Sequence, residues 1–203
     1  MFDTHGAKVL ALAAAVLITT ASASAIASTD LIVNGGFETG DTTGWTKVGN
    51  NSTPWNNVAT GNSYSGTYHY AVGNYASQGV AGLAQTFDTD RNADYSVSLA
   101  WADFASNLPG NQLFSVRWND HLIGQISESV ASTTWSQLSY TVKGTGRDTL
   151  TIEGFSESGY NRFDDVSVMR VAAAVPEPET YAMLLAGLGL IGASVKRRKA
   201  KQA

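Results

Sequence analysis

Apolar and polar residues alternate through the middle of the chain, between residues 28 and 174. No segment there keeps apolar residues at i, i+3, i+4 and i+7 over three helical turns, whereas a period of two recurs throughout. The clearest alternating segments are 95–101, 114–118, 138–142, 149–153 and 166–168. Because antiparallel sheets bury one face and expose the other, this pattern predicts an all-β domain of roughly nine or ten short strands.

Turn residues separate these segments. Asn119 and Asp120 stand between two strands and tolerate positive φ, so they predict a tight hairpin. The glycine-containing stretch 143–148 joins two further strands. Short strands at this spacing favour a two-sheet antiparallel sandwich, here a jelly roll. The domain is large enough to bury a core without disulfides, and the chain has no cysteine.

The N-terminus has the pattern of a secretory signal peptide over residues 1–27. Lys8 precedes the apolar run 9–18, which is too short to span a bilayer, and small residues with A-x-A spacing follow at 21–27. A buried helix is the alternative, but no polar face interrupts the apolar run. We therefore expect export and removal of this segment by signal peptidase.

Three features follow one another at the C-terminus: a proline-containing motif, an apolar stretch at 181–195 and a basic cluster. A helix of that length reaches about 22 Å, which is shorter than the ~30 Å hydrocarbon core, although flanking basic side chains can snorkel. The positive-inside bias keeps such a cluster in the cytoplasm. The motif is Val175, Pro176, Glu177 and Pro178, and the basic cluster is Lys196, Arg197, Arg198 and Lys199.

This order of features resembles the PEP-CTERM sorting signal of Gram-negative bacteria. The resemblance implies that residues 175–203 are a sorting signal, that the apolar helix enters the inner membrane transiently, and that an exosortase processes the tail. The expected destination is the cell surface or the extracellular matrix. A simple membrane anchor is the alternative.

Setting both ends aside changes the charge of the remainder. Residues 28–174 hold 7 basic and 14 acidic residues, a formal charge of −7. An acidic domain of this kind lacks the excess of basic residues that nucleic-acid binding requires. It suits a neutral or cationic partner or a bound cation.

Three further segments resemble exported jelly-roll domains that are similar to carbohydrate-binding modules and galactose-binding domains. They are the opening Asn34–Gly40 with Gly44-Trp45, the strand entry Thr134–Gln137 and the closing Phe163–Val168. In such modules a structural Ca²⁺ is common in this region, so the resemblance implies a calcium site formed by Glu38 with Asp165 or Asp164. Alternation turns Asp164 inward, and a β-bulge would turn Asp165 inward instead. The alternative is that these carboxylates accept backbone N–H groups or pair with Arg162.

Aromatic residues crowd residues 55–75 among asparagine and glutamine side chains. Sugars need a flat apolar face together with amide and hydroxyl partners, so this segment is a candidate glycan platform. Tyr68 and Tyr70 share one strand face with Val72, which equally describes a core stripe. The candidates are Trp55, Tyr64, Tyr68, Tyr70 and Tyr75. We assign Trp45, Trp101 and Trp135 to the core and His69 to a solvent-facing position.

No residue is assigned a catalytic role. The chain lacks G-x-S-x-G and H-E-x-x-H, and Glu153 with Glu157, the one pair considered for glycoside hydrolysis, fits solvated loop charges. The predicted function is therefore a non-enzymatic, exosortase-sorted surface or matrix protein associated with exopolysaccharide or biofilm. The alternative is a carbohydrate-binding module with an aromatic cleft, and a glycan-cleaving enzyme is the least favoured.

Overall fold

A computed structural model describes residues 29–104, 111–127, 134–157, 159–172 and 183–192. The predicted signal peptide, the proline motif and the basic cluster lie outside these residues. One compact unit spans Ile26–Ala172, and residues 183–192 form an α-helix within the other unit. None of the helices in the described ranges has the length and apolar character needed to span a membrane.

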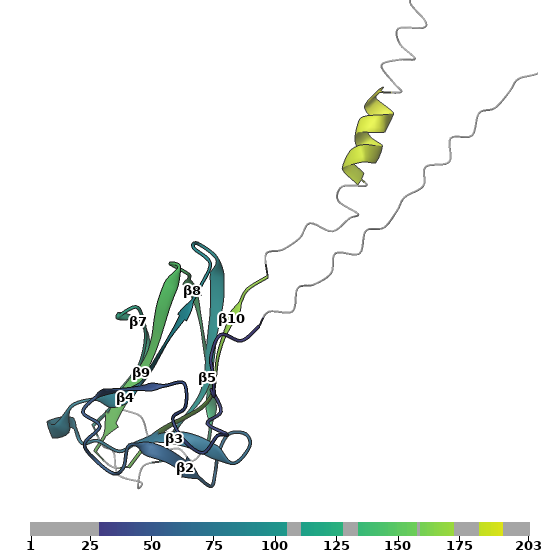
Figure 1. Cartoon of the computed structure of the whole chain (residues 1–203). Coiled ribbons are helices and arrows are strands. Elements are labelled where there is room, and N and C mark those ends of the chain that lie inside the picture. The colour runs from purple at the N-terminus through teal and green to yellow at the C-terminus, as the bar shows by residue number, and fades with distance from the viewer. Residues whose placement is uncertain (1–28, 105–110, 128–133, 158, 173–182, 193–203) are drawn as a thin grey trace, which may run out of the picture. The chain divides into compact units, whose positions relative to one another are not determined.

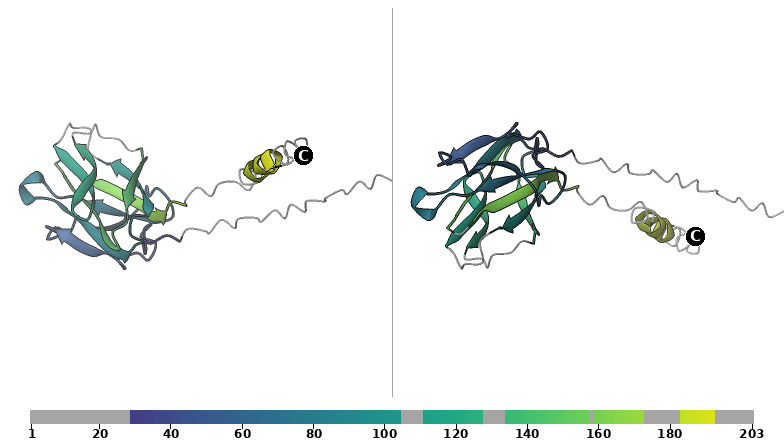
Figure 2. Two further views of the ribbon diagram at one scale, coloured as in Figure 1. Left: turned by 90° about the horizontal axis from the view of Figure 1, so that it is seen from above. Right: turned by 90° about the horizontal axis from the view of Figure 1, so that it is seen from below.

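The compact unit is a sandwich of two antiparallel sheets, with ten strands among its described residues (Figures 1 and 2). One sheet has the spatial order β1 (Thr46–Gly49), β4 (Ala81–Asp88), β9 (Arg147–Ser156), β6 (Gln112–Trp118) and β7 (His121–Ser127). The other has the order β2 (Asn57–Thr60), β3 (Tyr68–Val72), β10 (Asn161–Arg170), β5 (Asp94–Asp103) and β8 (Ser136–Lys143). A short 3₁₀ helix, η1 (Ala76–Gln78), follows β3. The predicted all-β sandwich is confirmed.

The alternation seen in the sequence becomes the core between the sheets. Along β5, Val97, Leu99 and Trp101 are buried. The β10 partners of Val97 and Trp101, which are Val168 and Phe163, continue the same layer. Phe37 lies at the centre of the aromatic packing, with ring centroids 5.8 Å from Tyr70 and 5.7 Å from Phe163. Each such side chain contributes about 1.5–3 kcal/mol through burial, which accounts for stability without disulfides.

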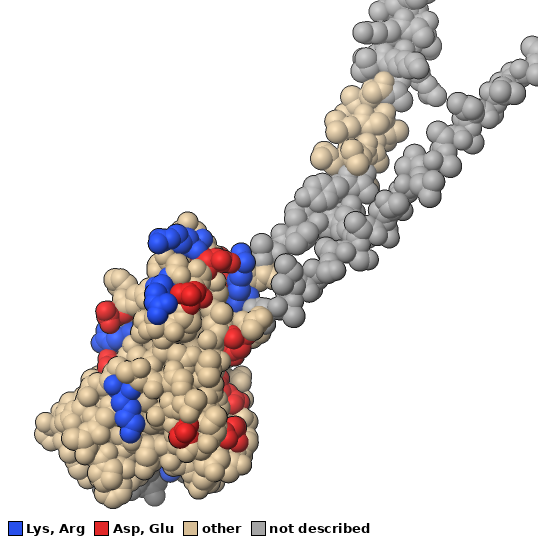
Figure 3. Space-filling view, in the orientation of Figure 1, with Lys and Arg blue, Asp and Glu red and all other residues tan. Residues whose placement is uncertain are grey.

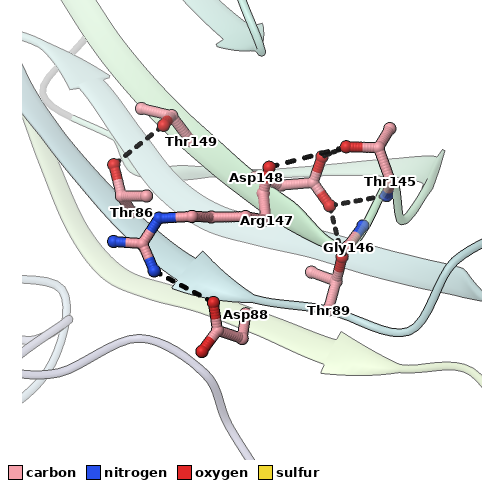
Figure 4. A network of polar contacts seen from close by, with 8 residues as sticks. All are labelled: Thr86, Asp88, Thr89, Thr145, Gly146, Arg147, Asp148 and Thr149. Carbon is pink, nitrogen blue, oxygen red and sulfur yellow. Dashed lines mark hydrogen bonds and ion pairs between the residues drawn. The ribbon is translucent and has the colours of Figure 1, made fainter.

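The predicted hairpin is confirmed, because Asn119 and Asp120 have φ of 50° and 66° between β6 and β7. The stretch 143–148 instead carries the chain from one sheet to the other. The buried Asp148 holds this crossing in place by accepting hydrogen bonds from Thr145 and Thr89 (Figure 4). Burial acts to raise the pKa of Asp148, but hydrogen bonds from Thr89, Thr145 and Asn119 outweigh it and lower the pKa overall.

The glycine pair near the N-terminus lets the chain lie directly against β10. A Cβ atom on Gly35 would come 1.9 Å from the Val166 carbonyl oxygen, and the Val166 N–H donates to the Gly35 carbonyl at 3.1 Å. Val166 lies within a bulge of β10 between Asp164 and Ser167, where Asp165 adopts a left-handed φ of 47°. The bulge therefore lies where the opening and closing segments of the domain meet.

Gly35→Ala is expected to lower the free energy of unfolding by about 1–3 kcal/mol, because the added methyl group meets backbone that cannot move independently. Gly36→Ala is the matched control, since its nearest neighbour is the Asp165 Oδ1 at 3.2 Å, the end of a side chain. Urea unfolding followed by tryptophan fluorescence measures both variants. An equal or smaller loss for Gly35→Ala would contradict this account of the contact.

Candidate functional site

Three carboxylates from opposite ends of the domain lie together around Gly36. A Cβ atom at that position would lie 3.2 Å from Asp165 Oδ1, 3.8 Å from Asp164 Oδ1 and 3.8 Å from Glu38 Cγ. Glu38 comes from the opening loop, and the two aspartates come from the bulge of β10. We call Glu38, Asp164 and Asp165 the acid clasp.

The acid clasp holds the loop between β2 and β3, residues 61–67. Asp164 Oδ2 accepts the N–H groups of Tyr64 at 3.0 Å and Ser65 at 3.3 Å. Glu38 Oε1 accepts those of Thr67 and Tyr68, each at 2.9 Å. The third carboxylate, Asp165, accepts the Ser65 hydroxyl at 2.7 Å. The N–H groups of Tyr64, Ser65 and Thr67 in this loop are thus satisfied by residues far away in the sequence.

Backbone and hydroxyl donors, as in the alternative considered from the sequence, are the contacts observed at these carboxylates. Across the described ranges, no group of three or more histidine, aspartate or glutamate side chains is arranged to hold a metal ion. The calcium site therefore stays a prediction from resemblance.

Asp164 is fully buried, and burial raises its pKa to about 6. Hydrogen bonds from the N–H groups of Asp165, Ser65 and Tyr64 act in the opposite direction and favour the carboxylate. At neutral pH the group is ionised, so the loop is held by charge-assisted bonds.

The loop places Tyr64 on the outer face of the sheet that contains β3 and β10, where aromatic rings surround Trp135. The Trp135 ring lies 5.9 Å from Tyr64 and 6.1 Å from Phe104, both edge to face. The Trp135 indole N–H donates to the Asn62 carbonyl at 2.9 Å, which ties the ring to the same loop. We call Tyr64, Phe104 and Trp135 the aromatic cluster.

Strand register explains what lies beside the aromatic cluster. Tyr70 and Phe163 are paired and face the core, so their neighbours His69 and Arg162 face outward. The His69 ring lies 6.0 Å from Trp135 and is fully buried, and Arg162 stacks 3.9 Å above the Phe104 ring. This face therefore combines aromatic surface with nitrogen-bearing side chains.

His69 is a neutral side chain in this setting. Burial, followed by the charge of Arg162, lowers its pKa to about 4. Its Nδ1 lies 3.1 Å from the Ser63 Oγ, another atom of the β2–β3 loop. The prediction that His69 is solvent-facing was wrong, because its outward position is covered.

The five aromatics predicted as a glycan platform do not form one surface. Tyr70 is fully buried and packs 5.3 Å from Phe163, so it belongs to the core, and burial raises its pKa. Tyr68 is half-buried and packs near Gly40.

The remaining three are exposed: Tyr64 by 39%, Trp55 by 52% and Tyr75 by 50%. Trp55 contacts Tyr160 at 6.4 Å instead of joining the aromatic cluster. Of the predicted aromatics, only Tyr64 therefore contributes to that cluster.

Trp135 was predicted to be a core residue, and this was wrong, because it is half-buried on the outer face. Trp45 and Trp101 are core residues, as predicted. Sequence reasoning did not assign Phe104 to a site and considered Arg162 only as an ion-pair partner. Because Phe163 faces the core, alternation along β10 turns its neighbour Arg162 to the outer face. This was the signal in the sequence that could have placed Arg162 at the site.

The two glutamates considered for hydrolysis have separate partners. Glu153 lies within β9, not in a loop, and forms an ion pair with Arg117 at 2.8 Å. Glu157 accepts the Ala76 N–H at 2.6 Å. The structure therefore gives both glutamates ordinary stabilising contacts.

Residues 174–199 match the family model described as the PEP-CTERM protein-sorting motif, which confirms the resemblance at the C-terminus. No curated protein matches the chain. Because this motif directs exosortase sorting, its presence indicates that the protein is exported.

Solved structures with a similar fold include two glycan-binding domains. The CBM22-1 xylan-binding domain of Paenibacillus barcinonensis Xyn10C is 20% identical with a TM-score of 0.53, covering 74% of this chain and 100% of that domain. TmCBM61, solved in complex with β-1,4-galactotriose, is 17% identical with a TM-score of 0.52, covering 71% and 100%.

A cyclase from Fischerella sp. TAU is also similar, with 18% identity, a TM-score of 0.54 and coverage of 73% of this chain and 100% of that chain. At these identities the likeness shows the fold alone, and it confirms the predicted similarity to jelly-roll carbohydrate-binding modules.

Asp164→Asn and His69→Gln are expected to show opposite pH dependence. The Asp164 pKa of about 6 lies above the unfolded value of about 3.9, so this group's contribution to stability falls as pH rises from about 4 to about 6. The His69 pKa of about 4 lies below the unfolded value of about 6.5, so its contribution rises with pH over about 4 to 6.5.

Urea unfolding at about pH 4.5 and about pH 7.5 measures both effects. The destabilisation by Asp164→Asn should be larger at the lower pH, and that by His69→Gln should be smaller there. One unit of pKa difference corresponds to about 1.4 kcal/mol, so changes on the order of 1 kcal/mol are expected. The same sign for both variants would refute the assignment.

Proposed function

We propose that this chain is an exported, non-enzymatic protein whose sandwich domain binds a polysaccharide outside the cell through the aromatic cluster. The observation that carries the proposal is the grouping of Tyr64, Phe104 and Trp135 on one sheet face beside His69 and Arg162. Aromatic rings offer apolar faces for sugar rings, and the half-buried Arg162 guanidinium offers donors for sugar oxygens.

The way the aromatic cluster is held supports binding. Its loop is fixed by the acid clasp, and Trp135 is fixed by its bond to Asn62. A surface ordered before the ligand arrives loses less conformational entropy when it binds. The similarity in fold to xylan- and galactotriose-binding domains is consistent with this use.

Delivery follows from the two ends of the chain. We propose that the signal peptide directs export, that the apolar C-terminal helix halts in the inner membrane, and that an exosortase then processes the sorting motif at 174–199. The domain is then displayed at the surface or in the matrix of a Gram-negative bacterium, where it associates with exopolysaccharide or biofilm. A structural Ca²⁺ at the acid clasp remains part of the proposal by resemblance.

Trp135→Ala is expected to weaken glycan binding at least about ten-fold, which corresponds to about 1.4 kcal/mol, because it removes the centre of the aromatic cluster. Trp55→Ala is the matched control, since it removes an exposed tryptophan outside that cluster. Binding to a panel of soluble galactan, xylan and polyuronates is measured by titration, with circular dichroism to verify folding. Loss of binding in Trp55→Ala alone would move the site away from Trp135.

Replacing Pro176 and Pro178 with alanine is expected to block processing of the tail. Intact-mass measurement of protein from the cell surface and the culture medium should show a natural form that lacks Lys196–Ala203. The double variant should retain these residues in the membrane fraction. A natural surface form that still carries the basic end would contradict exosortase processing.

A further inference from the structure

Arg162 is a half-buried cation at the proposed binding face. It faces outward from β10 between Ala71 and Ala102, and its guanidinium lies 3.9 Å above the Phe104 ring. Arg162 takes part in none of the ion pairs formed among described residues. Its Nε is buried and has no hydrogen-bond partner. A half-buried guanidinium left in this state is costly unless something else pairs with it.

His69 has a second unpaired nitrogen on the same face. Its Nε2 is buried without a hydrogen-bond partner, and the whole side chain is buried. The Ser63 hydroxyl has one proton and donates it to the Thr67 carbonyl at 2.9 Å, so Ser63 Oγ accepts from His69 Nδ1–H. This network assigns the proton to Nδ1 and leaves Nε2 as an acceptor.

The two side chains are neighbours across the strand pair. Arg162 pairs with Ala71, and His69 lies two residues along β3 on the same side, a diagonal separation of about 7–8 Å. The charge of Arg162 contributes to lowering the pKa of His69, as expected at this range. A ligand at the aromatic cluster thus meets one cationic donor, Arg162, while the covered His69 lies beside it as a neutral side chain.

We infer that the glycan bound at this face is acidic, with a uronic acid whose carboxylate pairs with Arg162 beside the aromatic cluster. The inference rests on the proposed glycan binding and specifies its ligand class. A planar guanidinium matches a carboxylate with two parallel hydrogen bonds, which no neutral sugar offers.

The inference reverses what net charge suggests. Residues 28–174 carry a formal charge of −7, which disfavours an acidic partner at long range. Figure 3 shows basic and acidic side chains next to one another at the upper end of the domain. Lys143, Arg147 and Arg170 are each paired with an aspartate. The long-range term is screened beyond about 8 Å at physiological salt, so a local pairing at Arg162 decides the preference.

The test compares polygalacturonate with its carboxyl-reduced form, which has the same linkage without the charge. Binding of the purified protein is followed by tryptophan fluorescence at about 150 mM salt. We expect carboxyl reduction to weaken binding at least ten-fold. We expect Arg162→Gln to remove this preference, and Arg162→Lys to keep part of it.

Arg91→Gln is the matched control, because Arg91 is exposed and precedes the start of β5, whereas Arg162 pairs near its end. It removes the same charge roughly 26 Å or more away along the strand, so it should leave the preference unchanged. An equal loss in Arg91→Gln would overturn the inference, since the effect would then be one of net charge.

The outcomes separate the two proposals. Equal binding of both polymers by the unaltered protein overturns the uronate inference while glycan binding stands. Binding of neither these polymers nor neutral galactan and xylan overturns glycan binding itself. The comparison of the two polymers needs no variant, so it tests the preference for a carboxylate even if Arg162→Gln fails to fold.

Discussion

The hydrogen bonds from the β2–β3 loop to the carboxylates of Asp164 and Glu38 are the contacts on which the outer face depends. A loop of this kind has backbone N–H groups that point away from any strand, and each would be costly if left unpaired. Asp164 and Glu38 accept four of these N–H groups, three from the loop and one from Tyr68, the first residue of β3. The ionised Asp164 strengthens the bonds from Tyr64 and Ser65, so the loop that bears Tyr64 and contacts Trp135 has a defined conformation.

The acid clasp also explains why the opening and closing segments of the domain have their particular residues. Gly35 lets the opening loop touch β10, and Phe37 turns into the core as Glu38 turns to the loop. The bulge of β10 puts Asp164 and Asp165 on the loop side while Val166 returns to the core. One set of residues thus joins the two termini of the domain and orders its outer face.

Periodicity was enough to predict the sandwich, the hairpin at Asn119-Asp120 and most of the core. It could not predict whether an outward-facing residue is buried, because other segments of the chain can pack over that residue. His69 alternates outward and yet is buried beneath Trp135, and Trp135 itself precedes β8, where alternation gives no side. The clustering of the three acidic residues was foreseen, but their hydrogen-bond partners could only be chosen once the loop was placed.

The partners in the acid clasp lie far apart in the chain: Tyr64 receives its acceptor from a residue 100 positions later. In a protein that crosses a membrane from its N-terminus, the loop emerges well before the strand that secures it. The outer face is therefore assembled last, when the final strand has been translocated and has inserted between β3 and β5. A chain arrested partway through secretion would expose its tyrosines and tryptophans without their final geometry, so the proposed ligand binding would be confined to molecules that have completed their passage.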